Sequence, residues 1–187
     1  MKIFSRSLKK LCMIVFLLTF IGIVGMQSDK AYAYSTGSTF TIYITTSDVN
    51  IRKGPGTSYE SYGVVPKYTA IDTGQVKETS GGWSKVDMVK SGSVKTGYIK
   101  SSYLRKSTSN RFYKATSNVK VRKGPGTSYS AITTVPKNAD QLLFYDYKVY
   151  ANGHNWVADL SCKVNSPVGS TGYDIIGLSW TAFDYYR

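Results

Sequence analysis

An internal repeat constrains this chain more than any other feature of its sequence. Residues 47–59 read SDVNIRKGPGTSY and residues 117–129 read SNVKVRKGPGTSY, with ten of the 13 positions identical. The offset of 70 residues persists further on, where the Val-Pro-Lys of residues 65–67 is matched by residues 135–137. A repeat of this length indicates one small folding unit used twice, so each residue has to be interpreted together with its counterpart.

Within each copy the pattern is typical of short strands and turns. Val49 and Ile51 alternate with polar neighbours, as do Val119 and Val121, so each pair is expected to face a core from a single strand. The Lys-Gly-Pro-Gly that follows cannot lie inside a helix and predicts a rigid loop. Further glycine-rich turns separate the remaining apolar segments. We therefore predict an all-β chain made of two small units, each a barrel or a sandwich, joined by a short linker.

The first 33 residues have the features of an export signal. Four basic residues precede an uncharged apolar run at 11–25, and Ala31-Tyr32-Ala33 supplies a small–x–small cleavage motif. The apolar run is shorter than the roughly 20 residues that span a bilayer. We expect cleavage after Ala33, no membrane span afterwards, and a secreted protein.

The residues that usually carry catalysis or metal binding are scarce. His154 is the only histidine, and Cys162 is the only cysteine after residue 33. A nucleophilic Cys–His pair needs both groups in hydrogen-bond reach together with a third group that orients them. One Cys and one His do not supply a tetrahedral zinc site, and neither a phosphate-binding loop nor a distinct carboxylate pair is present. We expect a binding protein that is not an enzyme and holds no metal or cofactor.

The order of the motifs resembles that of the bacterial SH3 (SH3b) domain family. The first copy has Val-x-Ile-Arg-Lys-Gly-Pro-Gly-Thr-Ser-Tyr, then Val-Pro-Lys, Gly-Trp-x-Lys-Val and Thr-Gly-Tyr-Ile-x-x-x-Tyr-Leu. The resemblance implies that the chain behind the signal peptide at 1–33 consists of two small SH3-like β-barrels in tandem joined by a short linker. Its parts are a leader at 34–42, a first domain at 43–105, a linker at 106–112 and a second, divergent domain at 113–187. Members of the family are typically non-catalytic modules that target exported proteins, and many hold hydrolases on peptidoglycan.

The second copy departs from the pattern after its first half. Trp156 follows Trp83 by 73 residues, and Gly172-Tyr173 follows Gly97-Tyr98 by 75, so insertions are expected. A slip of one residue exchanges the two faces of a strand. We therefore expect the last strand of the second copy to be bulged or differently paired.

The repeated loop supplies the candidate ligand-binding residues, for which two interpretations stay open. Either Gly and Pro shape the loop while its Arg aligns against neighbouring carbonyls, or the basic side chains line a groove. Tyrosines after the loop could form an exposed stacking platform, whereas Trp83, Tyr98, Trp156 and Tyr173 are expected in the core. The candidates are Arg52, Lys53, Tyr59, Arg122, Lys123 and Tyr129.

The net charge adds an expectation about partners. Residues 34–187 hold 19 Lys or Arg against 10 Asp or Glu, hence +9, which favours peptidoglycan or anionic wall polymers as ligands. We predict a cell-wall-associated protein. The alternatives are an accessory or truncated form of a wall hydrolase (amidase or peptidase type) and an extracellular peptide-binding signalling module. The charge also suits nucleic acid, but export argues against that partner.

Overall fold

The computed structural model describes residues 40–72, 75–78 and 80–187. The predicted signal peptide and most of the predicted leader lie outside these residues. The described residues belong to one compact unit, Thr39–Arg187. None of its helical segments has the length and apolar character needed to cross a membrane. The all-β prediction is confirmed, because strands dominate this unit and the helical segments are short 3₁₀ turns.

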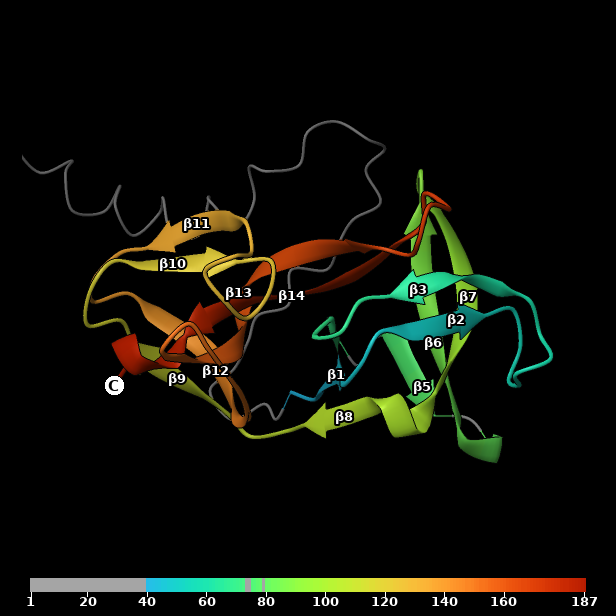
Figure 1. Cartoon of the computed structure of the whole chain (residues 1–187). Helices are drawn as coiled ribbons and strands as arrows, with labels where there is room; N and C mark the ends of the chain where they lie inside the picture. The colour runs from blue at the N-terminus through green and yellow to red at the C-terminus, as the bar shows by residue number, and fades with distance from the viewer. Residues whose placement is uncertain (1–39, 73–74, 79) are drawn as a thin grey trace, which may run out of the picture. The chain divides into compact units, whose positions relative to one another are not determined.

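The first half of the unit forms antiparallel strands in the order β3-β2-β7-β6, with β5 on β6 and with β1 between β4 and β8 (Figure 1). The elements are β1 (Ile42–Thr45), β2 (Val49–Arg52), β3 (Ser61–Val65), β4 (Ala70–Asp72), β5 (Val76–Glu78), η2 (Ser80–Gly82), β6 (Trp83–Lys90), β7 (Ser93–Lys100), η3 (Ser101–Tyr103) and β8 (Leu104–Ser107).

The second half is built around a long antiparallel hairpin, β13–β14, with β12 and β9 beside it and with β10–β11 joined to β14. The elements are β9 (Asn110–Lys114), β10 (Val119–Arg122), β11 (Ala131–Val135), β12 (Asp140–Ala151), β13 (His154–Pro167), β14 (Asp174–Ala182) and η4 (Phe183–Tyr185).

The repeated sequence forms the same local structure twice. β2 pairs with β3 and β10 pairs with β11, each with a register shift directly before the Arg of the repeat. Val49, Ile51, Val119 and Val121 are all buried, which confirms the predicted alternation. The Arg of each copy then pairs with a residue of the closing strand. Arg52 pairs with Tyr98 of β7, and Arg122 pairs with Trp180 of β14.

That last pairing corrects the alignment of the second copy. Trp180, rather than Tyr173, occupies the position of Tyr98. The amide of Thr116 donates to the Tyr185 carbonyl at 2.8 Å, as the amide of Thr46 donates to that of Tyr103 at 2.9 Å. Residues 179–187 therefore correspond to residues 97–105. The register of β13 with β14 places Trp156 opposite Ala182, as Trp83 lies opposite Lys100. The additional residues lie mainly at the far end of the β13–β14 hairpin, which is why Gly172-Tyr173 resembles the motif without occupying its place.

The lengthened end of this hairpin packs on the first half of the unit. Asp174 pairs with Val89, and Gly177 pairs with Ile71. The amide of Gly169 donates to the Val64 carbonyl at 3.1 Å. β14 is therefore differently paired, which is one of the two outcomes expected from the sequence, and the irregularity in its pairing with β13 lies on β13 between Asp159 and Lys163.

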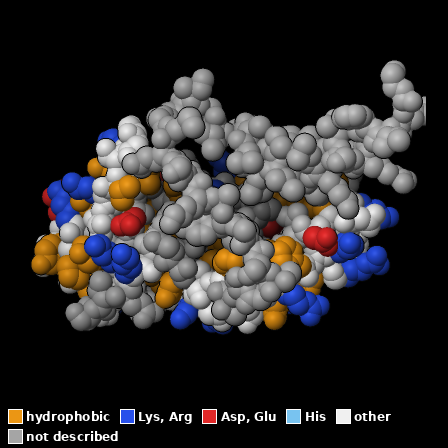
Figure 2. Space-filling model, turned by 180° about the vertical axis from the view of Figure 1, so that it is seen from behind, with side chains coloured by type: hydrophobic (Ala, Val, Ile, Leu, Met, Phe, Trp, Pro, Cys, Tyr) orange, Lys and Arg blue, Asp and Glu red, His pale blue; other side chains and the backbone are white. Residues whose placement is uncertain are grey.

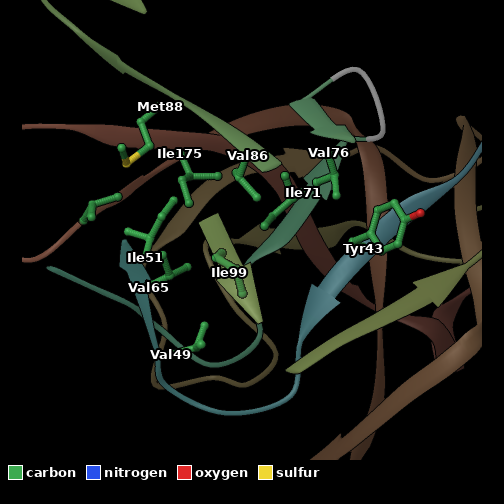
Figure 3. Packing of buried hydrophobic residues seen from close by; sticks show 11 residues of the cluster. Tyr43, Val49, Ile51, Val65, Ile71, Val76, Val86, Met88, Ile99 and Ile175 are labelled. Carbon is green, nitrogen blue, oxygen red and sulfur yellow. The ribbon is translucent and has the colours of Figure 1, made fainter. Parts of the chain in front are cut away.

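Three hydrophobic clusters result, and two of them draw on both copies. Figure 3 shows Ile175 from β14 lying among Val86, Met88 and Ile71 in the first cluster. The third cluster contains residues of the second copy, including Val121. The second cluster, named the shared cluster below because both copies contribute several residues to it, consists of Ile42, Ile44, Ala70, Phe144, Trp156, Ala158, Leu178, Trp180 and Ala182. Because all strands join one 14-stranded network, the prediction of two separate barrels is not confirmed.

The segment predicted as a linker, residues 106–112, lies largely in β8 and β9. The turn between these strands is held by Asp146, whose carboxylate accepts hydrogen bonds from the Ser107 hydroxyl and from the amides of Thr108 and Ser109. Burial raises the pKa of Asp146, but these hydrogen bonds outweigh burial and leave it below its usual value. The joint between the two copies is thus tied to β12.

Candidate functional site

The arginine of each repeated loop binds the loop itself. Arg52 Nη1 donates to the Tyr59 carbonyl at 2.8 Å, and Arg122 Nη1 donates to the Tyr129 carbonyl at 2.7 Å. Both arginines are half-buried. Each guanidinium therefore joins the start of its loop to the end, as the interpretation based on loop shape predicted.

The tyrosine of each loop lies on the glycine that follows the lysine. A Cβ atom on Gly54 would overlap the Tyr59 ring, and one on Gly124 would overlap the Tyr129 ring. The two tyrosines nevertheless remain 49% and 38% exposed. Glycine is required here because the ring needs the space, and the outer side of each ring faces solvent. This geometry suits stacking on a sugar or on an apolar ligand group.

The lysines of the two loops are exposed but differ in their surroundings. Lys53 Nζ lies 2.6 Å from Glu60 Oε2 and 5.8 Å from the centre of the Tyr62 ring. The hydrogen bond with Glu60 raises the pKa of Lys53. At the positions of Glu60 and Tyr62 the second copy has Ser130 and Ile132. The six predicted residues thus form two loop sites, each of which brings together one Arg, one Lys and one Tyr.

The tryptophans and tyrosines expected in the core differ in burial. Trp156 is 2% exposed, whereas Trp83, Tyr98 and Tyr173 are half-buried. Tyr173 packs edge-on against Tyr62, with ring centres 5.9 Å apart. Trp180 is fully buried, and its indole N–H donates to the Tyr68 carbonyl at 3.1 Å.

The only histidine lies at the β12–β13 turn. His154 Nδ1 lies 3.2 Å from Asp184 Oδ2, and this carboxylate also accepts hydrogen bonds from the amide and side chain of Asn155. Burial raises the pKa of Asp184, but the hydrogen bonds from Asn155 and His154 outweigh burial and lower it. Half-buried Cys162 packs against the third hydrophobic cluster. Across the part of the chain that the structure describes, no three His, Cys, Asp or Glu side chains are grouped so as to hold a metal ion.

Sequence reasoning missed a second group of aromatic and basic side chains, on β9, β12 and η4. Tyr113 packs edge-on against Tyr145 and Phe183, with ring centres 6.0 and 5.0 Å apart. Arg111 lies 5.1 Å from the centre of the Tyr113 ring, and Lys148 Nζ lies 4.5 Å from that of Phe183. The sequence carried no signal for this group, because the pairing of β9 with β12 brings its members together. Figure 2 likewise shows Lys and Arg beside hydrophobic side chains on the face it presents.

Residues 47–105 match the family described as bacterial SH3 domain. This match confirms the SH3-like prediction for the first copy. No curated protein matches the chain.

Two solved structures are similar to the chain, those of NlpC2 and NlpC1 from Trichomonas vaginalis, each at 14% sequence identity. The NlpC2 match covers 82% of this chain and 49% of that one, with a TM-score of 0.28. The NlpC1 match covers 87% and 51%, with a TM-score of 0.30. This chain thus spans about half the length of each of these proteins.

Proposed function

We propose that the chain is an exported, non-catalytic protein that binds the bacterial cell wall, with peptidoglycan or anionic wall polymers as its ligand. The observation that carries the proposal is the bacterial SH3 match over residues 47–105, together with a second copy of the same loop, closed by the same Arg-to-carbonyl bond. We take the second copy as a divergent SH3-like module that is completed by residues 179–187.

Two loop sites on one chain suit a polymeric ligand. Once one site is occupied, the second binds at a high effective concentration, so two weak sites give useful avidity. The net charge of +9 over residues 34–187, from 19 basic and 10 acidic residues, adds attraction to an anionic polymer. That part of the affinity should weaken with salt, whereas stacking on Tyr59 and Tyr129 should persist.

Sedimentation with purified bacterial sacculi tests the proposal. The protein tested is residues 34–187, which contain the whole compact unit. Point variants are used rather than isolated repeats, because the two copies share strand pairing and a hydrophobic core. We expect the wild type to sediment at low salt and the double variant Tyr59→Ala, Tyr129→Ala to sediment less at every salt concentration. Tyr150→Ala is the control, since Tyr150 is 73% exposed and belongs to neither loop. If the wild type stays in solution at low salt, wall binding is rejected. If Tyr150→Ala loses as much sedimentation as the double variant does, the loop sites are rejected.

Zymography on wall substrate tests the non-catalytic part. We expect no cleared band. A cleared band that disappears in Cys162→Ala would replace the proposal with the wall-hydrolase alternative.

A further inference from the structure

The two loops are a matched pair that differs at the position facing the lysine. Between Arg52 and Tyr59, and between Arg122 and Tyr129, the sequences are identical. The next residue is Glu60 in the first copy and Ser130 in the second, and in both copies its carbonyl accepts a hydrogen bond from the lysine amide, at 2.9 and 3.1 Å. The loops therefore share this closing backbone hydrogen bond but carry different charges beside the lysine.

In the first loop, the lysine already forms an ion pair with a side chain of the same protein. Glu60 Oε2 lies 2.6 Å from Lys53 Nζ, with the two side chains 46% and 72% exposed. A ligand carboxylate or phosphate would have to displace Glu60 to reach this ammonium group. The ion pair also shows that an oxyanion fits beside the lysine of this loop.

In the second loop the lysine is available. Lys123 takes part in no ion pair or cation–π contact within residues 40–72, 75–78 and 80–187. Its ammonium group belongs to the same loop as the exposed Tyr129 ring. An oxyanion and an adjoining sugar or apolar group could therefore bind together.

The second loop is also held more firmly. Arg122 Nη1 donates to the Thr127 carbonyl as well as to that of Tyr129, at 3.2 and 2.7 Å. Asn152, in the β12–β13 turn, accepts a hydrogen bond from the Thr127 amide at 3.0 Å. Pro125 is buried, whereas its counterpart Pro55 is exposed. A loop fixed before binding loses less conformational entropy when a ligand arrives.

We propose that the second loop is an oxyanion-binding site, in which Lys123 pairs with a carboxylate or phosphate of the ligand while Tyr129 contacts the adjoining sugar or polyol. Glu60 takes the place of that oxyanion in the first loop and suppresses oxyanion binding there, so the first loop contacts the polymer through Tyr59 alone. This inference rests on the proposed function, because it names the chemistry by which the chain would hold a wall polymer.

Soluble probes test the inference independently of sacculi. Residues 34–187 are titrated at constant ionic strength with an oligosaccharide of glucuronate (carboxylate), an oligomer of glycerol phosphate (phosphate) and neutral chitotetraose. Binding is followed by calorimetry and by NMR shifts of the Lys123 and Tyr129 amides. We expect at least one anionic probe to bind and to move these two signals, and whichever probe binds identifies the oxyanion.

The variants test each loop separately. Lys123→Gln should weaken binding of that probe by roughly threefold to tenfold, the scale of one charge-assisted hydrogen bond. Ser130→Glu should weaken it at least as much, and Glu60→Ser should add a second binding equivalent. Lys95→Gln and Ser102→Glu make the same charge changes at exposed positions away from the loops and should change the affinity by less than about twofold.

Failure of the inference is distinguishable from failure of the proposed function. If neither anionic probe binds, or if Lys123→Gln weakens binding no more than Lys95→Gln does, the oxyanion site is rejected. Sedimentation of the wild type with sacculi would still support wall binding in that case. If Glu60→Ser keeps its thermal unfolding transition but binds no additional equivalent of the probe, the suppressing role of Glu60 is rejected.

Discussion

Ile175 links the two copies of the repeat, and truncating it should weaken both. Its side chain belongs to the second copy but is fully buried in the first hydrophobic cluster, so the Ile175→Ala substitution removes three buried carbon atoms. Such a change costs about 2–5 kcal/mol, and the cost is higher where the surroundings cannot collapse. Strand pairing of the neighbouring Asp174 with Val89 restrains this site, so we expect about 3 kcal/mol.

Urea unfolding and hydrogen exchange measure the effect. With a urea dependence of about 2 kcal/mol per M, the midpoint should fall by about 1.5 M, and Tm should fall by about 6–12 °C. Exchange protection should decrease in β2, β6 and β7 as well as in β13 and β14, because the clusters unfold together. Ile132→Ala, at a 38% exposed position of the second copy, should cost less than about 0.5 kcal/mol. Lost protection confined to residues 119–187 would refute the claim that the hairpin completes the first core.

Two further predictions concern contacts between the copies. Gly63 has φ 149°, and a Cβ there would lie 3.0 Å from the Val168 carbonyl oxygen. The Gly63→Thr substitution should therefore lower the free energy of unfolding in urea by about 1–3 kcal/mol. The reverse change at the matching position of the second copy, Thr133→Gly, should lower it by less than about 1 kcal/mol. Asp146 has a lowered pKa, so its carboxylate stabilises the fold above its unfolded pKa of about 3.9, and that stabilisation is lost as pH falls through the lower folded value. Asp146→Asn should therefore be less stable than wild type by about 1 kcal/mol near pH 6. The urea midpoints of the two proteins should converge as the pH falls below the unfolded value, and a gap that stays constant with pH would contradict this role.

Local features of the fold follow from the sequence because they depend on neighbouring residues. The alternation of Val49 with Ile51 predicts a strand with one buried face, and its counterpart in the second copy behaves in the same way. The Gly-Pro-Gly motif predicts a loop that cannot be helical. The same string also predicted that its arginine could bind neighbouring carbonyls, and Arg52 and Arg122 both do so.

The sequence identified the residues that make up the two candidate loop sites, but not which lysine is paired with a carboxylate of the protein itself. The sequence shows that Ser130 replaces Glu60, yet the importance of that difference depends on the side chain of Glu60 reaching Lys53 across the loop. The aromatic and basic group around Tyr113 was not predictable, since it requires the register in which Tyr113 lies opposite Gln141.

The sequence by itself determined that one strand–loop–strand unit occurs twice, with the same buried valine and isoleucine positions. The tertiary structure alone decided which of the matching strands is covered by the other copy. Ile42 is 1% exposed, whereas its counterpart Phe112 is 49% exposed, although both are apolar residues on matching strands. The second copy covers the first at Ile42 through the shared cluster, while nothing in the described residues buries Phe112 in the same way. Burial depends on which distant strands pack together, and a local repeat carries no information about that contact.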